Sequence, residues 1–549
     1  MNGVPDATED TLSIVARPTP IYFIGDSHCI PFNNLLFRDR VEGRDYLAIA
    51  KYIPNINGDR MLEGQHVNPH LIWALAAESL IVFRDGTWYA RHVEERAEEP
   101  ILVFFCGDID VRGMADMIGP DGDFLLHAAL SDADQFTAAA DRRLIPLSII
   151  EDAVNRKVWR MLAALNTLYL AGFRQIFLHS IPPDSSLQPG LLRYRLTTLF
   201  HGAIRANAPL AGVRFLNVWS QLTERNRLIR RFYLDGIHLN KEASTVSVRA
   251  MFRHLRPHSD VELVEQLRPV YFVGDERVNE FANIVYRPAD GEVSHVVRSH
   301  HLRYFSLDAA WHGEAPNQEL FHALFSDMIL VYDFQTRQFS PWHNPANRGN
   351  ESLAKASLRS RRDPTIVVFT GIADIAEIAV MATPEAELQR RVAIFGMLMR
   401  HMRASGFQKL FVARVDERGP DASYAVRANA LLDGACAHAG VHRLPATEGV
   451  VETIGVVDQL ARSLGQATLL PVYSLAWEVE RSGYSWKRGT TEAVRADPPI
   501  RISLDRALAG RFRQRLHFGR MDDRERVDWQ SDCIGRHAAR GEWAVADEA

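Results

Sequence analysis

The chain has 549 residues, of which 47% are hydrophobic and 24% are charged, the balance of an ordinary globular protein. Its formal net charge of −5 gives no electrostatic reason to expect nucleic acid or an anionic membrane as a partner. The four cysteines form no CxxC pair and no zinc-type spacing, so we expect free thiols in a reducing compartment and no bound metal.

The first 18 residues are expected to form an N-terminal tail. They carry acidic side chains and lack the basic region and the apolar region of a signal peptide. The longest apolar runs of the chain, such as 101–106, are far too short to cross a bilayer. These features predict a cytoplasmic protein without a membrane partner.

After this tail the chain alternates between apolar runs and amphipathic segments. Four runs are rich in β-branched and aromatic residues, as are strands buried on both faces: 21–24, 101–106, 175–179 and 213–218. Residues 151–171 carry apolar side chains three or four positions apart, and Gly172 follows as a helix end. The alternation predicts an α/β fold with a parallel sheet covered by helices on both sides.

The first apolar run ends in the sequence Gly-Asp-Ser-His, which places Ser27 just after a sharp turn. In such folds the reactive residues gather at the carboxyl edge of the sheet. A serine is weakly nucleophilic unless a base removes its proton. His238 is the candidate base, and Asp235 lies three residues before it, where a carboxylate can orient the imidazole.

These blocks resemble those of the GDSL, or SGNH, hydrolases, which are flavodoxin-like α/β esterases with relatives that transfer acyl groups. The resemblance covers most of residues 20–250. It implies that Ser27 is the nucleophile, His238 the base and Asp235 the residue that orients the base. It also implies that the backbone N–H groups of Ser27 and Gly107 help to form an oxyanion hole.

The chain departs from the family pattern in its third block. The family's Gly-x-Asn-Asp reads Gly107-Asp108-Ile109-Asp110 here, so Ile109 stands where an asparagine would donate to the oxyanion. Arg112 is the nearest replacement, because its guanidinium carries a fixed charge and several donors. Arg112 is equally suited to bind an acidic substrate, or to pair with Asp108 or Asp110.

Five stretches of the first half recur in the same order in the second half, which predicts a tandem duplication. The pairs are 20–26 with 269–275, 102–110 with 367–374, 171–184 with 405–418, 211–213 with 439–441, and 233–240 with 503–510. We expect two flavodoxin-like three-layer α/β/α domains with parallel sheets. The expected segments are a tail (1–18), an SGNH-like catalytic domain (19–258), a degenerate copy (268–520) and a C-terminal extension (521–549). Residues 454–500 have no partner in the first half and are interpreted as an insertion or a diverged edge.

The second copy is expected to be non-catalytic. It keeps three carboxylates, Asp275, Asp374 and Asp505, which correspond to Asp26, Asp110 and Asp235. The residues lost are Ser27, Asp108, Arg112 and His238, replaced by Glu276, Ile372, Ala376 and Leu508. We expect the kept carboxylates to support turns and loops in both halves.

The sequence therefore predicts a serine esterase that hydrolyses a small acyl ester through an acyl-serine intermediate. No metal or organic cofactor is implied, and the expected substrate is a small-molecule or glycan ester. Acetyl on a carbohydrate is the example that the resemblance implies. Two alternatives stay open: an O-acyltransferase using the same triad, and a non-catalytic binding or scaffold protein. The oligomeric state is unknown.

Overall fold

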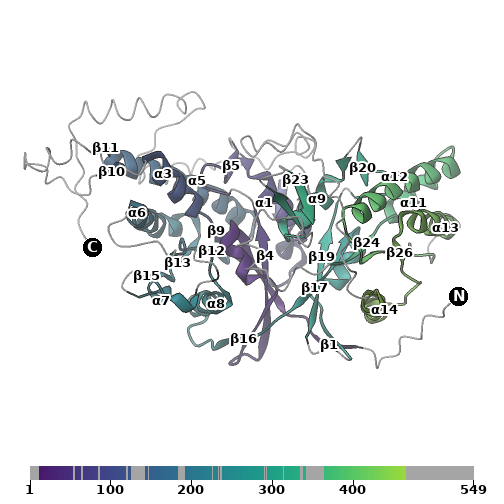
Figure 1. Ribbon diagram of the computed structural model, residues 1–549, viewed down its shortest axis with the longest axis horizontal. Helices are drawn as coiled ribbons and strands as arrows, with labels where there is room; N and C mark the ends of the chain where they lie inside the picture. Colours follow the sequence, from purple (N-terminus) through teal and green to yellow (C-terminus); the bar gives the residue numbers. More distant parts are fainter. Residues whose placement is uncertain are drawn as a thin grey trace, which may run out of the picture.

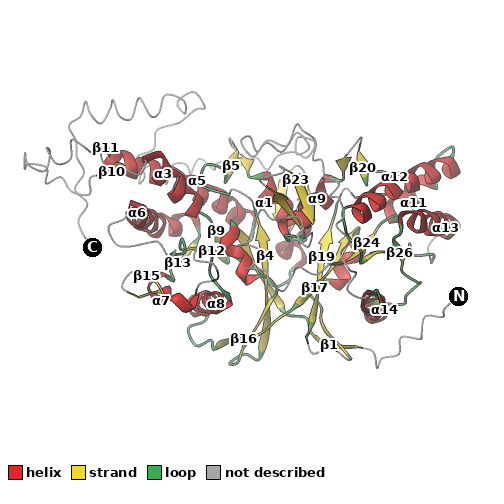
Figure 2. Cartoon of the chain, in the orientation of Figure 1, coloured by secondary structure: helices red, strands yellow, loops and turns green. Residues whose placement is uncertain are grey.

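The structure, a computed structural model, describes residues 12–464 apart from internal gaps. The gaps are 54–55, 64–65, 85–86, 119–121, 125–142, 146, 184–191, 225–226, 233, 235–237, 290, 292, 304, 313–314, 334–337, 342–363 and 419–420. The described residues form two seven-stranded sheets that lie side by side, each with helices around it (Figures 1 and 2). The predicted α/β fold is confirmed.

The first sheet has the strand order β13-β12-β9-β2-β4-β3-β16. The strands are β2 (Thr19–Gly25), β3 (Leu35–Asp39), β4 (Arg44–Tyr52), β9 (Ile101–Phe105), β12 (Ile176–His179), β13 (Arg214–Leu216) and β16 (Val261–Gln266). The five strands from β13 to β4 run parallel. Strand β3 pairs antiparallel with β4, and β16 pairs antiparallel with β3, so β16 runs in the same direction as the five. Strands β9 and β12 are wholly buried, which explains their unbroken apolar sequences.

The side chains of β2 alternate between two cores. Tyr22 and Ile24 join the core under α1 (Pro69–Ala77), α3 (Asp108–Ile118), α5 (Leu147–Ala171) and α6 (Leu192–Asn207). Ile21 and Phe23 join the opposite core, under the 3₁₀ helix η2 (Ser27–Phe32) and α8 (Lys241–Leu255). Helices therefore cover both faces of the first sheet.

The second sheet repeats this plan with the order β26-β25-β24-β17-β19-β18-β1. Its strands are β1 (Leu12–Ala16), β17 (Arg268–Gly274), β18 (Val285–Pro288), β19 (His295–His301), β24 (Thr365–Phe369), β25 (Leu410–Val412) and β26 (His442–Arg443). One face carries α9 (Gln318–Ser326), α11 (Ile372–Ile378), α12 (Pro384–Ala404) and α13 (Ala422–Ala439). The other carries the 3₁₀ helix η5 (Glu276–Phe281) and α14 (Val450–Ser463).

Shorter elements lie in the connections. The short helices are α2 (Arg91–Glu95), η3 (Ala208–Ala211), α7 (Trp219–Leu222) and η4 (Arg230–Phe232). The two-stranded sheets pair β5 (Leu62–Glu63) with β6 (His66–Val67), β7 (Ile81–Arg84) with β8 (Thr87–Ala90), β10 (Gly122–Phe124) with β11 (Arg143–Ile145), β14 (Thr223–Glu224) with β15 (Arg227–Leu228), β20 (Trp311–His312) with β21 (Ala315–Pro316), and β22 (Leu330–Asp333) with β23 (Gln338–Pro341). No described helix has the length and apolarity needed to cross a membrane.

The two halves exchange edge strands. Strand β1 precedes β2 in the chain, yet it pairs with β18 of the second sheet. Strand β16 precedes β17, yet it pairs with β3 of the first sheet. Thus β1 lies inside the predicted N-terminal tail, and β16 lies between the two predicted domains. Neither segment was predicted as a strand. Three of the five β1 residues are exposed, and one of the six β16 residues is buried.

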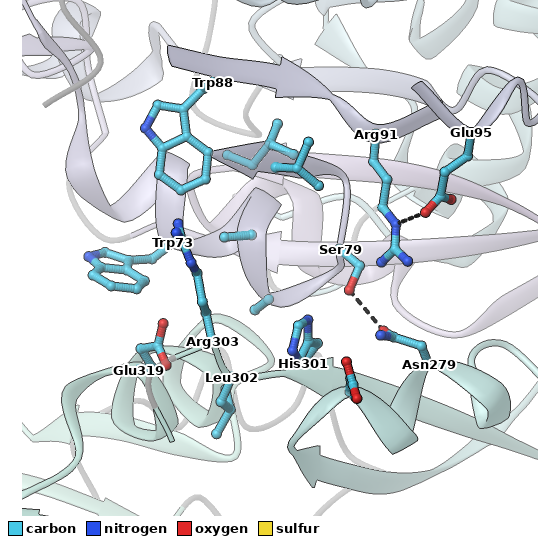
Figure 3. A pocket seen from close by; sticks show the side chains of 15 residues that line it. Trp73, Ser79, Trp88, Arg91, Glu95, Asn279, His301, Leu302, Arg303 and Glu319 are labelled. Carbon is cyan, nitrogen blue, oxygen red and sulfur yellow. Dashed lines mark hydrogen bonds and ion pairs between the residues drawn. The ribbon is translucent and has the colours of Figure 1, made fainter. Parts of the chain in front are cut away.

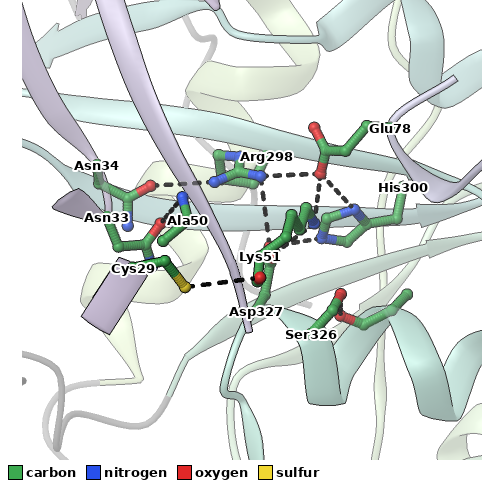
Figure 4. A network of polar contacts seen from close by, with 11 residues as sticks. Cys29, Asn33, Asn34, Ala50, Lys51, Glu78, Arg298, His300, Ser326 and Asp327 are labelled. Atoms are coloured by element: carbon green, nitrogen blue, oxygen red, sulfur yellow. Dashed lines mark hydrogen bonds and ion pairs between the residues drawn. The ribbon is translucent and has the colours of Figure 1, made fainter. Parts of the chain in front are cut away.

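The halves also meet around a cavity of about 350 Å³ beside η5, lined by residues of both halves (Figure 3). Elsewhere in the interface lies a buried ionic cluster that joins the two sheets (Figure 4). Lys51 of β4 contacts the carboxylates of Glu78, which follows α1, and Asp327, which follows α9. Arg298 Nη2 lies 2.9 Å from Glu78 Oε1, and His300 Nε2 lies 2.8 Å from Asp327 Oδ2.

Candidate active site

Ser27 lies at the carboxyl edge of the first sheet because Gly25 permits a close approach of two strands. Gly25 has a φ of +150°, and a Cβ added to it would lie 1.9 Å from the Phe105 carbonyl oxygen of β9. Only glycine fits such a position. The Asp26 side chain then accepts a hydrogen bond from the His28 N–H at 3.0 Å and caps η2, whose first residue is Ser27.

The structure brings Ser27 and His238 together. Ser27 Oγ and His238 Nε2 are hydrogen-bonded at 2.8 Å, although the residues are 211 positions apart in the sequence. His238 is 7% exposed and lies just before α8, whose N-cap is Asn240. Asp235, the predicted orienting residue, lies outside the described residues.

Gly107 and Asp108 follow β9, the parallel neighbour of β2, so their turn meets the Ser27 turn at the same edge. Gly107 has a φ of +113°, which L side chains rarely adopt. Among the described residues, no hydrogen bond has the backbone N–H of Ser27 or Gly107 as its donor. Both groups therefore have the donor capacity that the resemblance implies for an oxyanion hole.

A buried ion pair links the residues that follow Ser27 and Gly107. His28 Nε2 lies 3.3 Å from Asp108 Oδ2, and both side chains are less than 10% exposed. Arg112 Nη2 also contacts Asp108, at 2.6 Å, and Arg193 Nη2 lies 3.4 Å from the other carboxylate oxygen. Of the roles that the sequence left open for Arg112, the observed contact is the pairing with Asp108. Sequence reasoning missed the His28–Asp108 pair, whose only signal was that each residue follows a predicted oxyanion donor.

The charges of this pair follow from its surroundings. Burial raises the pKa of Asp108, but His28 and Arg112 outweigh it and hold the pKa at about 2. Burial lowers the pKa of His28, but Asp26 and Asp108 more than offset this, so the pKa is raised. Burial raises the pKa of Asp26 to about 6. The His28 and His238 rings lie 5.3 Å apart, so this ionic pair borders the Ser27–His238 pair.

Asp110 has a structural contact that recurs in the second half. Asp110 Oδ2 accepts a hydrogen bond from the Gly58 N–H at 2.7 Å, and its counterpart Asp374 accepts one from the Leu307 N–H at 2.7 Å. A cation from the following long helix neutralises each carboxylate: Lys157 for Asp110 and Arg391 for Asp374. The expectation that these kept carboxylates hold loops is confirmed at this position.

The second half keeps the turn but fills it differently. A Cβ added to Gly274 would lie 1.8 Å from the Phe369 carbonyl oxygen, the same close approach as at Gly25. Arg277 stands at the position of His28 and makes an ion pair with Asp275 at 2.8 Å. Its guanidinium also donates to the carbonyl oxygens of Thr370 and Arg414, at 3.1 and 2.7 Å. In the second half, Glu276 therefore stands at the position of the half-buried Ser27, and Arg277, bound to its own turn, stands at the position of His28.

Helix α14 changes the interpretation of the end of the second half. It packs on the face of the second sheet that corresponds to the face covered by α8 in the first. Residues 454–463 therefore belong to the core and are not part of an insertion. The connection from β26 to α14 is only 444–449, Leu-Pro-Ala-Thr-Glu-Gly, whereas 217–240 of the first half carries His238. The predicted counterparts Asp505 and Leu508 lie outside the described residues.

The buried ionic cluster contains side chains of metal-ligand type. Ligand atoms of Glu78, His300 and Asp327 lie within 4.8 Å of one another. Lys51 and Arg298 already neutralise the two carboxylates, and with Arg298 and Lys51 as neighbours the pKa of Asp327 falls below its usual range despite burial. A divalent cation here would face two buried positive charges, so we assign the cluster to the interface.

No family model matches the chain, and no curated protein sequence is similar to it. The crystal structure of a GDSL-like lipase from Bacteroides thetaiotaomicron is similar with a TM-score of 0.23 and 12% sequence identity. That match covers 44% of this chain and 91% of the lipase chain. Similarity at this level does not define a function.

Proposed function

We propose that the first half is a serine esterase that hydrolyses a small-molecule or glycan ester. The observation that carries the proposal is the 2.8 Å hydrogen bond between Ser27 Oγ and His238 Nε2 at the carboxyl edge of the sheet. A serine within hydrogen-bond reach of an imidazole is the arrangement that activates a hydroxyl for acyl transfer.

In the proposed reaction, His238 Nε2 accepts the Ser27 proton while Oγ bonds to the acyl carbon and the carbonyl electrons move to its oxygen. When the tetrahedral intermediate collapses, the bond to the alcohol oxygen breaks, and His238 delivers its proton to that oxygen. Water then attacks the acyl-serine with His238 again as the base, which releases the acid and restores Ser27. We propose that Asp235 orients the imidazole.

The oxyanion would accept hydrogen bonds from the Ser27 and Gly107 N–H groups. In this proposal the His28–Asp108 pair holds the two turns in position, so that both N–H groups point at the oxyanion. The pair takes the place of the family's asparagine contact. Arg112 then acts on Asp108 rather than on the oxyanion, as its 2.6 Å contact suggests. His28, with its raised pKa, would add positive charge beside the developing oxyanion.

We also propose that both halves are flavodoxin-like domains and that the second is non-catalytic. The order of the parallel strands supports the first point, because in each half the first strand lies between the second and the third along the chain. Glu276 and Arg277 support the second point. A carboxylate at the turn is a much weaker nucleophile toward an acyl carbon than an activated serine, and it repels a developing oxyanion.

The test is hydrolysis of p-nitrophenyl acetate and labelling by a fluorophosphonate probe, which reports activated serines. Wild-type protein should turn over the ester and carry the label on Ser27. Ser27→Ala should lose both, whereas Ser463→Ala, which removes an exposed hydroxyl of α14, should keep both. Label on a serine of the second half, or full activity in Ser27→Ala, would refute the assignment. Transfer of acetyl to an added sugar instead of water would identify an acyltransferase. If the wild-type protein neither hydrolyses the ester nor takes the label on Ser27, the remaining alternative is a binding protein.

A further inference from the structure

The cavity between the halves lies at the turn of the second half, at the position that corresponds to Ser27 in the first. Glu276 lines it from η5, while Trp73, Trp88 and Arg91 line it from the first half (Figure 3). The Ser79 hydroxyl donates to Asn279 Oδ1 at 2.9 Å and joins the halves at this cavity. Ligands of open α/β sheets bind at this edge, and about 350 Å³ suits a small molecule.

The charged groups around the cavity nearly balance. Arg91 and Arg303 supply two guanidinium groups, and three carboxylates lie with them: Glu95, Glu276 and Glu319. Arg91 Nε is already paired with Glu95 Oε1 at 2.5 Å. A strongly anionic ligand would face the carboxylates, and a cationic ligand would face the guanidinium groups. The balance favours a neutral ligand with several polar groups.

The remaining polar groups can both donate and accept hydrogen bonds. Burial lowers the pKa of His301, and the nearby Arg91 lowers it further, so the ring is neutral near pH 7 and has one donor and one acceptor nitrogen. Asn279 provides an amide, which has the same dual capacity. A ligand rich in hydroxyl groups matches such a lining, because each hydroxyl donates once and accepts twice.

The apolar part of the lining is aromatic and held in place. The Trp73 ring stacks on His322 with centroids 6.0 Å apart and planes within 5°, and Trp88 is 8% exposed. Ala76, Ala77 and Leu302 complete an apolar side. Fixed aromatic surface beside balanced polar groups suits a ring that has a face of C–H groups and a rim of hydroxyls.

We propose that this cavity binds a neutral saccharide residue. Binding uses Arg303 and Glu276 for the hydroxyl groups and the two indoles for the apolar face. It requires neither Ser27 nor His238, so the site is separate from the proposed esterase. The second half then contributes recognition through the turn at which the first half carries its nucleophile.

The experiment is calorimetric titration of the full chain with glucose, galactose, mannose and N-acetylglucosamine, together with glucuronic acid and glucosamine as charged comparators. At least one neutral sugar should bind, and more tightly than the charged comparators. Arg303→Ala and Glu276→Gln should each weaken binding about tenfold or more, since each removes hydrogen bonds to a charged group. Ser27→Ala should bind like the wild type.

Glu280→Gln is the matched control, because Glu280 is exposed on the same 3₁₀ helix but does not line the cavity. It should bind the sugar normally, and the thermal unfolding midpoint shows whether each variant is folded. Three results would overturn the proposal: no binding of any neutral sugar, tighter binding of a charged comparator, or binding that Arg303→Ala and Glu276→Gln leave unchanged. Loss of binding in Ser27→Ala alone would place the sugar at the esterase site and also overturn it.

Discussion

His28 Nε2 lies 3.3 Å from Asp108 Oδ2, and the two residues directly follow Ser27 and Gly107. The side-chain pair therefore connects the two backbone segments whose N–H groups would bind the oxyanion. Its counterpart in the second half is missing, because Arg277 and Ile372 occupy the two positions.

The first prediction concerns this pair. Asp108→Asn and His28→Gln should each lower kcat for p-nitrophenyl acetate about ten- to a hundredfold while KM stays nearly unchanged, since the pair acts on the transition state. Wild-type turnover should also fall on the alkaline side as His28 loses its proton, and His28→Gln should lack this decline. Asp116→Asn, an exposed change on the same helix, serves as the control. A raised KM with unchanged kcat would count against the pair, and the thermal unfolding midpoint of each variant shows whether a lower kcat comes from misfolding.

The second prediction concerns the pH dependence of stability. Burial raises the pKa of Asp26 to about 6 in the folded protein, above its ordinary value of 3.8. The folded state then holds the proton more tightly, so stability is full below about pH 4 and declines as the pH rises to about 6. Asp26→Asn keeps a capping oxygen and removes the titration, so its free energy of unfolding at pH 8 should exceed that of the wild type by about 1–3 kcal/mol.

This difference should disappear near pH 4, as denaturant titrations at the two pH values will show. Asp260→Asn is the control, since its carboxylate is 61% exposed. A variant that is equally destabilised at both pH values would indicate that the carboxylate is needed for the cap rather than penalised by burial.

The third prediction concerns Lys51, which is 1% exposed and lies between two carboxylates. Lys51→Met removes one partner of a buried ionic cluster and should lower the free energy of unfolding by about 3–5 kcal/mol. Arg38→Met removes an exposed partner of Asp45 and should cost less than about 1 kcal/mol. Because the cluster belongs to both halves, the Lys51 variant should unfold in one transition, whose midpoint is lower than that of the wild type. Separate loss of a single half would contradict the shared interface.

The fourth prediction tests the exchanged strands by hydrogen exchange. Ile14→Pro interrupts β1 and should speed exchange of the amides of residues 285–287 in β18, which lie far away in the sequence. Leu263→Pro interrupts β16 and should speed exchange in residues 35–39 of β3. Ile14→Thr keeps the strand and is the matched control. Faster exchange of β3 in the Ile14 variant, with β18 unchanged, would contradict the pairing.

Much of the fold could be predicted from local patterns. The helix expected over 151–171 is part of α5 (Leu147–Ala171). Strands β2 and β9 carried unbroken apolar runs because both of their faces are buried. The Ser27 turn was visible because a glycine and a capping carboxylate have local signatures.

Features that depend on contacts between distant residues left no such signature. The exchange of β1 and β16 is decided by which sheet offers an open edge, and Lys51 gains its role only when Asp327 approaches from the other half. Sequence comparison did not match α14 to α8, although the two helices occupy corresponding positions. The connection before α14 is much shorter than the connection before α8, so the two helices are out of register along the chain. Whether Asp235 faces His238 stays a prediction.

The exchanged edge strands also bear on how such a chain can arise and change. A protein with a single copy of this unit would lack the last strand of its own sheet and would have to take it from an identical neighbour, so its stable form would be a symmetric pair. Joining two copies in one chain makes that pairing independent of concentration. Each copy must then keep the surfaces on which the other depends, but only one copy must keep the proposed nucleophile. The exchanged strands therefore keep both halves in the chain, because each half needs a strand from the other. They place no constraint on the side chain at the turn of the second half, which can change.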